Sequence, residues 1–171
     1  VGTYNMSIEV LREKLVQAKK ENKLPKLVVP VHFSGQSCEM KDIWELSKEY
    51  GFKVIEDASH ALGGEYKNKK VGCCEYSHIT VFSFHPVKMI TTGEGGAITT
   101  NDKDLDEKIK LLRSHGIIRN KEKFKNNNDG DWYYEQQVLG FNYRLSDIQA
   151  ALGISQLKRL DSFVLRRREI A

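Results

Sequence analysis

The feature that most constrains the fold is the alternation of short apolar runs with segments of helical periodicity. The first run is rich in valine and lies between Pro25 and Gly35, as expected for a buried strand. Amphipathic segments, with apolar residues three or four positions apart, separate the runs. A strand, a helix and a further strand form a crossover unit, so the pattern predicts an α/β fold with a mostly parallel sheet flanked by helices. The predicted strands are residues 26–33, 53–55, 79–84 and 96–100, and the predicted helices are residues 7–18, 43–50, 102–114 and 146–155.

Length and composition suit a single domain covering residues 1–171. No apolar run reaches the roughly 18 residues of a membrane span, so no membrane partner is expected. The net charge of +4 comes from basic residues that are mixed with acidic ones, in helical stretches such as 103–110 and 166–168. We interpret these stretches as solvated helix faces, and we expect no nucleic-acid partner. The expected location is cytoplasmic.

The cysteines do not suggest a disulfide framework. Cys73 and Cys74 are adjacent, and Cys38 is left over, which favours reduced thiols in a cytoplasmic protein. A zinc site made of Cys73, Cys74 and His78 matches the spacing of no common zinc finger, so no metal is expected.

Polar residues occur where two predicted strands end. Asp57 follows one strand and Ser83 closes the next, and the carboxyl ends of parallel strands share one rim of a sheet, where ligands bind. Lys88 comes between the second of these strands and a glycine-rich turn at residues 93–96. A pyridoxal cofactor requires a lysine that forms an imine and a carboxylate that keeps the ring nitrogen protonated. The function therefore depends on whether Lys88 and Asp57 face one site.

Each candidate also has an ordinary structural interpretation. Lys88 could be a surface lysine, although apolar neighbours argue against this, and Asp57 could cap the turn after its strand. Ser83 could be a hydroxyl that is satisfied locally. Isolated histidines are more often structural than catalytic, which applies to His60, His85 and His115. The chain lacks the Gly-x-Ser-x-Gly pattern of a serine hydrolase.

Several segments, taken together, resemble the DegT/DnrJ/StrS family of sugar aminotransferases, which belongs to the aspartate aminotransferase superfamily of fold type I. The segments occur in family order and at family spacing, at residues 29–36, 56–63, 71–72, 82–100, 113–116 and 140–151. The resemblance implies that residues 1–171 form the central part of the large domain of a fold type I transferase that depends on pyridoxal 5'-phosphate.

The resemblance also implies roles for individual residues. Lys88 would hold pyridoxal phosphate covalently and move a proton between the substrate and the cofactor. Asp57 would pair with the pyridine nitrogen, His60 would lie beside the phenolic oxygen, and Ser83 would bind the phosphate. Asn142 would reach the cofactor phosphate of a neighbouring subunit, so the resemblance implies a homodimer with shared active sites.

The implied reaction moves an amino group from glutamate to a keto group of a nucleotide-linked sugar. The histidine at position 60 and the Ser-Phe-His-x-x-Lys form at residues 83–88 resemble enzymes that aminate a UDP-linked 4-keto-6-deoxy hexosamine for pseudaminic acid. A sugar 3-dehydratase of the same family would carry histidine in place of the lysine, so Lys88 argues against that alternative. A further alternative is a non-catalytic or regulatory family member.

The chain departs from the family pattern at both ends. The family has a longer N-terminal stretch, with a phosphate-binding turn and an aromatic residue that stacks on the cofactor, and a smaller C-terminal domain. The chain opens with Val1 and closes at Ala171 within a charged helical pattern, which suggests a segment of a longer protein. The segment 122–134 is also longer and more polar than the family pattern.

Overall fold

The computed structural model describes residues 2–125 and 130–171, so residues 126–129 of the polar segment, and Val1, lie outside the described residues. The contacts divide the chain into two compact units. The first consists of Val1–Asn101 together with Asp147–Ala171, and the second is Asp102–Ser146. The single domain expected from the sequence stays a prediction, and we describe each unit by itself.

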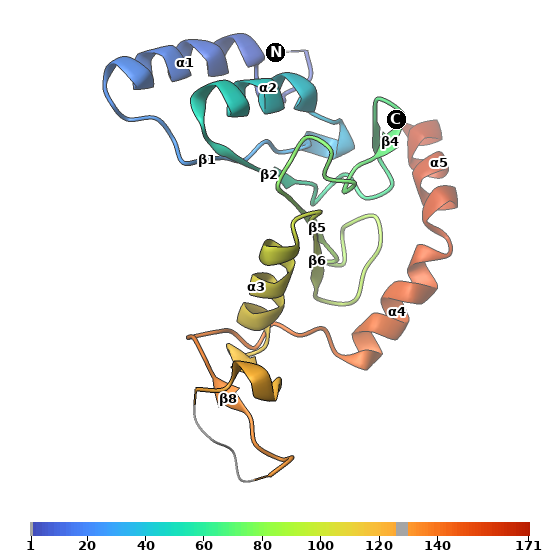
Figure 1. Ribbon diagram of the computed structural model, residues 1–171. Coiled ribbons are helices and arrows are strands. Elements are labelled where there is room, and N and C mark those ends of the chain that lie inside the picture. The colour runs from blue at the N-terminus through green and yellow to red at the C-terminus, as the bar shows by residue number, and fades with distance from the viewer. Residues whose placement is uncertain (1, 126–129) are drawn as a thin grey trace. The chain divides into compact units, whose positions relative to one another are not determined.

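A four-stranded sheet in the order β1-β2-β5-β6 forms the centre of the first unit (Figure 1). The strands are β1 (Leu27–Val28), β2 (Lys53–Asp57), β5 (Ile79–Ser83) and β6 (Gly96–Thr99). The first three strands are parallel, and β6 pairs antiparallel with β5. The predicted α/β class with a mostly parallel sheet is therefore confirmed.

Helices α1 (Ile8–Lys20) and α2 (Met40–Tyr50) pack beside β1 and β2. The helix ends agree with the sequence, because the Ser7 hydroxyl accepts the Val10 N–H at 3.2 Å and Gly51 ends α2 with φ 78°. The apolar faces of these elements meet in one cluster. The buried members of this core cluster are Leu15, Val28, Cys38, Met40, Ile43, Leu46, Phe52 and Val54.

The first predicted strand is shorter in the structure than in the sequence analysis. The regular pairing of β1 ends at Val28, and Pro30 follows without an N–H that could continue it. The chain then makes a single bridge from Val31 to Asp57 and turns into a short 3-10 helix, η1 (Phe33–Gly35). The early end of the strand brings this turn to the carboxyl end of β2.

A small antiparallel hairpin was not predicted. It consists of β3 (Glu65–Tyr66) and β4 (Lys69–Lys70). Its turn residues, Lys67 and Asn68, have φ values of 49° and 64°. Its strands have two residues each and carry several charged side chains, so they lack the apolar alternation that identifies a strand.

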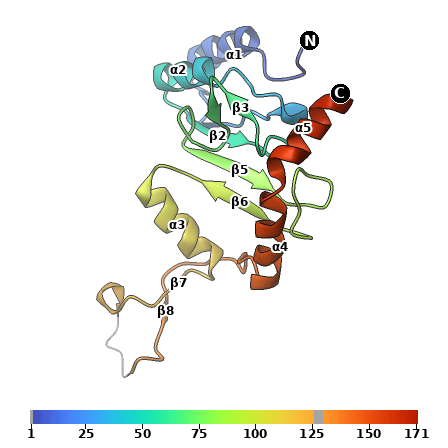
Figure 2. The ribbon, with the colours of Figure 1, turned by 90° about the vertical axis from the view of Figure 1, so that its right-hand side faces the viewer.

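Two helices from the end of the chain, α4 (Asp147–Leu157) and α5 (Leu160–Ile170), complete the first unit. Figures 1 and 2 both show them beside the segment that joins β5 to β6. The predicted helix at 146–155 is thus confirmed as α4, which begins directly after Ser146.

The second unit contains α3 (Lys103–Arg113), β7 (Ile117–Ile118), η2 (Lys121–Lys123) and β8 (Glu135–Gln136). The Asp102 carboxylate accepts the N–H groups of Asp104 and Leu105 and begins α3. Strands β7 and β8 are antiparallel. Across both units, within residues 2–125 and 130–171, no helix has the length and apolar character needed to cross a membrane.

Candidate functional site

The carboxyl ends of β2 and β5 form the rim on which the candidate site lies. The two strands are parallel neighbours, and Asp57, the last residue of β2, is paired with Val81. Ser83 ends β5 two residues further along. The predicted shared rim is confirmed, and it follows directly from the parallel register.

The alternation of side chains along β2 separates two neighbouring carboxylates. Glu56 is buried, and its Oε2 lies 3.1 Å from Nε2 of the buried His32. The other ring nitrogen of His32, Nδ1, accepts the Cys38 N–H at 3.1 Å, so Nε2 carries the proton that Glu56 accepts. Asp57 faces the opposite side of the sheet and is partly exposed. Glu56 is therefore engaged by a buried partner, His32, whereas the Asp57 side chain is accessible from the opposite face of the sheet.

The Asp57 carboxylate is held in its ionised form. Burial alone would raise its pKa, but the hydrogen bonds from the side chain and the N–H of Ser59, the latter to Oδ1 at 3.0 Å, lower the pKa below its ordinary value, and the electrostatic interaction with Lys88 adds to this. The backbone of Asp57 is also fixed, because its N–H donates to Pro30 O at 2.9 Å. Asp57 can therefore offer a stationary negative charge at neutral pH.

His60 lies on the turn after β2 and faces η1. The Ser34 N–H donates to its Nδ1 at 3.3 Å, and the Phe33 ring meets it edge-on with centroids 6.3 Å apart. Gly35 brings backbone close to backbone here, since a Cβ at this position would lie 3.0 Å from the His60 carbonyl oxygen. The 3-10 turn thus fixes both the backbone and the ring of His60.

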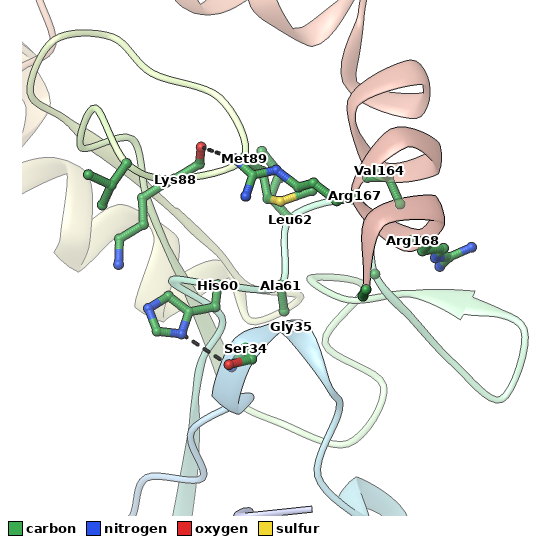
Figure 3. A pocket seen from close by; sticks show the side chains of 13 residues that line it. Ser34, Gly35, His60, Ala61, Leu62, Lys88, Met89, Val164, Arg167 and Arg168 are labelled. Atoms are coloured by element: carbon green, nitrogen blue, oxygen red, sulfur yellow. Dashed lines mark hydrogen bonds between the residues drawn. The ribbon is translucent and has the colours of Figure 1, made fainter.

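Lys88 lies in the segment between β5 and β6. Its N–H donates to His85 O at 3.0 Å, and its side chain extends toward His60 (Figure 3). Its apolar neighbours differ in exposure to solvent: Ile90 is 1% exposed, whereas Val87 is 71% exposed. The segment is anchored at Ile90 and open to solvent at Val87.

Lys88 and His60 line the same cavity, which has a volume of about 460 Å³ (Figure 3). Backbone and side chains of η1 form another part of the wall, through Ser34 and Gly35. Helix α5 contributes further basic groups, through Arg167 and Arg168. The volume lies within the usual range of small-ligand pockets, roughly 300–1,000 Å³, and the basic groups favour an anionic ligand.

Of the predicted site residues, Lys88 and His60 line this cavity, whereas Asp57, Ser83 and Asn142 are not part of its lining. The Ser83 hydroxyl accepts the His85 N–H at 3.4 Å, just before the Lys88 segment. Asn142 belongs to the second unit, where it forms an antiparallel bridge with Ser114. The roles expected for Ser83 and Asn142 stay predictions.

The residues present fit the chemistry that pyridoxal phosphate requires. The Lys88 amine can form a covalent bond to an aldehyde, and an ionised Asp57 can pair with a cationic ring nitrogen. Basic side chains on the cavity wall suit a phosphate. The fit rests on the amine, carboxylate and basic groups among the described residues and on the volume of the cavity.

Arg167 is a residue of this region that the sequence analysis did not single out. Residues 166–168 were interpreted as a solvated face, and Arg167 is indeed exposed. Its Nη2 nevertheless donates to the Lys88 carbonyl oxygen at 3.4 Å (Figure 3). No local sequence signal could reveal this contact, because 79 positions separate the two residues.

Known proteins are similar to this chain in both sequence and structure. The model of the DegT/DnrJ/EryC1/StrS aminotransferase family matches residues 2–171. The chain is 52% identical over 140 residues to UDP-4-amino-4,6-dideoxy-N-acetyl-beta-L-altrosamine transaminase of Campylobacter jejuni, covering 82% of this chain and 34% of the relative. It is 45% identical over 146 residues to the spore coat polysaccharide biosynthesis protein SpsC of Bacillus subtilis, covering 85% of this chain and 37% of the relative.

A solved structure agrees with these matches. It is PseC of Helicobacter pylori, an aminotransferase involved in the biosynthesis of pseudoaminic acid, which matches with a TM-score of 0.78 and 42% identity. The alignment covers 92% of this chain and 38% of PseC, so the chain spans between a third and two-fifths of the length of these relatives. The family uses pyridoxal phosphate. The chain, which matches the family model over nearly its whole length, belongs to the DegT/DnrJ/EryC1/StrS family of sugar aminotransferases.

Proposed function

We propose that the protein is an aminotransferase that uses pyridoxal 5'-phosphate to move an amino group from glutamate to a keto group of a nucleotide-linked sugar. The observation that carries the proposal is the cavity shared by Lys88 and His60, next to an Asp57 carboxylate whose pKa lies below its ordinary value. Membership of the sugar aminotransferase family supports the same reaction class.

The side chains would have two kinds of role, which are to hold the cofactor and to transfer protons. When bound, pyridoxal phosphate supplies an electron sink that stabilises negative charge on the substrate carbon. Lys88 would hold the cofactor and carry the transferred proton on Nζ, and Asp57 would hold the ring nitrogen by its negative charge. Because Nδ1 of His60 accepts the Ser34 N–H, the neutral His60 ring carries its proton on Nε2 and can donate it to a cofactor oxygen.

The substrate proposed here is a UDP-linked 4-keto-6-deoxy hexosamine. The proposal is supported by the 52% identity to the Campylobacter jejuni transaminase, whose name specifies a UDP-linked 4-amino-4,6-dideoxy sugar. Arg167 and Arg168 on the cavity wall are compatible with an anionic substrate of this kind.

The proposed active form is a homodimer with shared sites, in which Asn142 contacts the cofactor phosphate of the partner. The stretch around Asn142 exposes large apolar side chains, and burial against a second subunit would remove them from water. The most exposed of these are Leu139, Phe141 and Tyr143, at 89%, 55% and 72%. Mixed dimers of Lys88→Ala and Asn142→Ala subunits should regain activity if the sites are shared, and should remain inactive if each subunit works alone.

The direct test is an amino-transfer assay on the full-length protein with pyridoxal phosphate, glutamate and the UDP-linked 4-keto sugar. The expected result is formation of the amino sugar together with 2-oxoglutarate, and its loss in Lys88→Ala. Lys53→Ala, which changes a lysine on β2, is the matched control and should keep the activity. Amino transfer that survives in Lys88→Ala would refute the role of Lys88.

A further inference from the structure

Helices α4 and α5 contact the backbone of the segment that carries Lys88 at successive points. Gln149 Nε2 donates to Glu94 O at 2.8 Å, and the Thr91 N–H donates to Gln156 Oε1 at 3.4 Å. Arg167 Nη2 donates to Lys88 O at 3.4 Å. As the helices advance from 149 to 167, their partners run backwards from 94 to 88, so the helices and the segment lie antiparallel along this contact.

A glycine lets the helix backbone approach the same segment closely. Gly153 is buried within α4, and a Cβ at this position would lie 2.9 Å from Thr92 Cγ2. Thr92 is itself only 3% exposed. Glycine is less favourable than alanine inside a helix, so its presence at this point of contact indicates a requirement for close packing.

Backbone hydrogen bonds within residues 84–95, the segment that carries Lys88, join its beginning to its end. The Phe84 N–H donates to Gly95 O at 2.8 Å, and the Thr92 N–H donates to Phe84 O at 3.0 Å. The Lys88 N–H closes a local turn onto His85. Between these points, the Lys88 carbonyl and the Thr91 N–H are the backbone groups that Arg167 and Gln156 contact.

We propose that Gln156 and Arg167 are positioning residues for Lys88, acting through the backbone of residues 88–91. The inference rests on the proposed function in one respect, namely that the Lys88 amine is the reacting group. Small displacements of a reacting group cause large losses of rate, and the helices supply the contacts that the segment's own bonds do not provide.

The first arm of the test measures amide hydrogen exchange residue by residue, by NMR, in the full-length protein without cofactor. Gln156→Leu should raise the exchange rate of the Thr91 amide by roughly five- to tenfold, as expected for the loss of one hydrogen bond. Gln156→Glu keeps an acceptor oxygen and should restore the protection. The Thr92 amide, which donates to Phe84, is the internal control and should not change. Equal Thr91 exchange in wild type and Gln156→Leu would overturn the proposal.

The second arm measures how fast an amine-specific reagent, trinitrobenzenesulfonate, modifies Lys88 without cofactor, as a function of pH and with peptide mapping. Arg167→Ala should change the Lys88 rate by at least about threefold, the effect of one weak contact, and Arg167→Lys should restore part of it. Arg166→Ala is the matched control, because its side chain pairs with Glu169 on the surface at 3.0 Å. Equal Lys88 rates in Arg167→Ala and Arg166→Ala would contradict the proposal.

The cofactor-loaded enzyme provides a third readout. Gln156→Leu, which changes a residue outside the cavity lining, should lower kcat for amino transfer while leaving KM for the sugar nucleotide nearly unchanged, whereas a change confined to KM would contradict positioning. The first two arms need neither cofactor nor substrate. A failure of the proposed reaction is therefore distinguishable from a failure of this inference.

Discussion

The core cluster under α1 and α2 and the rim at the carboxyl ends of β2 and β5 belong to the same sheet but are held by different forces. The core cluster consists of fully buried apolar side chains, among them Ile43 and Val54 at 0% exposure. The rim consists of partly exposed polar groups, and side chains such as Gln149 and Gln156 bond to the backbone of the segment that follows β5. Strands β1 and β2 connect the two regions.

Positive φ values occur in both regions, because Gly51 ends α2 with φ 78° beside the core cluster. Around the rim the chain repeatedly adopts positive φ, at Ser34 (53°), Gly35 (86°), Gly63 (81°) and Gly93 (79°). Of these four residues only Ser34 has a Cβ, for which such a value is unfavourable and persists where the surroundings enforce it. The core cluster therefore provides stability through apolar burial, whereas the rim holds site residues in position through hydrogen bonds and close backbone contacts. Substitutions in the two regions should therefore have separable effects.

The largest expected effect comes from the core cluster. Phe52, at 2% exposure, fills space between α2 and the sheet. Phe52→Ala should lower the free energy of unfolding by about 3–5 kcal/mol, because it removes buried surface and leaves a cavity. Urea unfolding followed by tryptophan fluorescence measures this loss, and Phe52→Leu should cost less. A loss below about 1 kcal/mol would break the comparison, since it would mean that the core cluster does not dominate stability.

The next effect tests the residue that joins the two regions. Glu56 belongs to the buried face of β2 and directly precedes Asp57. Glu56→Ala should lower the free energy of unfolding by about 2–4 kcal/mol, because the buried His32 N–H loses its acceptor. Glu56→Gln keeps an acceptor oxygen, and we expect a loss of about 1 kcal/mol. Equal losses in the two variants would show that the hydrogen bond does not matter and that packing alone acts.

A smaller effect isolates the contact between η1 and His60. Gly35→Ala places a Cβ at positive φ and 3.0 Å from the His60 carbonyl oxygen. Gly51→Ala is the matched control, because its φ is also positive but, among the described residues, no atom outside its chain neighbours lies within 4 Å of the added Cβ. Both should lose about 1 kcal/mol, and only Gly35→Ala should move the NMR signals of the His60 ring. Unchanged His60 signals would show that η1 does not position this residue.

The smallest expected effect is a pH dependence that arises from Asp57. Its pKa in the folded state is below the ordinary value of 3.8, so the carboxylate stabilises the fold above pH 3.8, and this contribution is lost as the pH falls through the lower, folded-state pKa. Between pH 6 and pH 3, the urea midpoint should therefore fall less in Asp57→Asn than in wild type. Asp161→Asn, on α5, serves as the control for a change of net charge. Identical pH profiles in wild type and Asp57→Asn would contradict the assigned charge environment.

Much of the fold was predictable because its determinants are local. Apolar periodicity identified α1 and α2, and Ser7 and Gly51 marked helix ends through capping interactions that involve only near neighbours. The shared rim followed from the expected parallel order of the strands, which placed Asp57 and Ser83 at one edge. These predictions required no knowledge of contacts between distant segments.

The features that escaped prediction depend on distant contacts or on very short elements. The β3–β4 hairpin has strands of two residues, too short for periodicity to show. The early end of the first strand depends on how Pro30 and Val31 meet Asp57. The contact of Arg167 with Lys88 joins a helix and a segment far apart in sequence, so the sequence pattern could indicate only a charged helix face.

The measurement that tests the central claim most directly is borohydride reduction of the full-length protein with pyridoxal phosphate, followed by mass mapping of the labelled peptide. The account predicts one dominant reduced adduct, on Lys88, that disappears in Lys88→Arg without appearing at another lysine. An adduct spread evenly over surface lysines, or a dominant adduct on any residue other than Lys88, would contradict the assignment of this rim as the cofactor site.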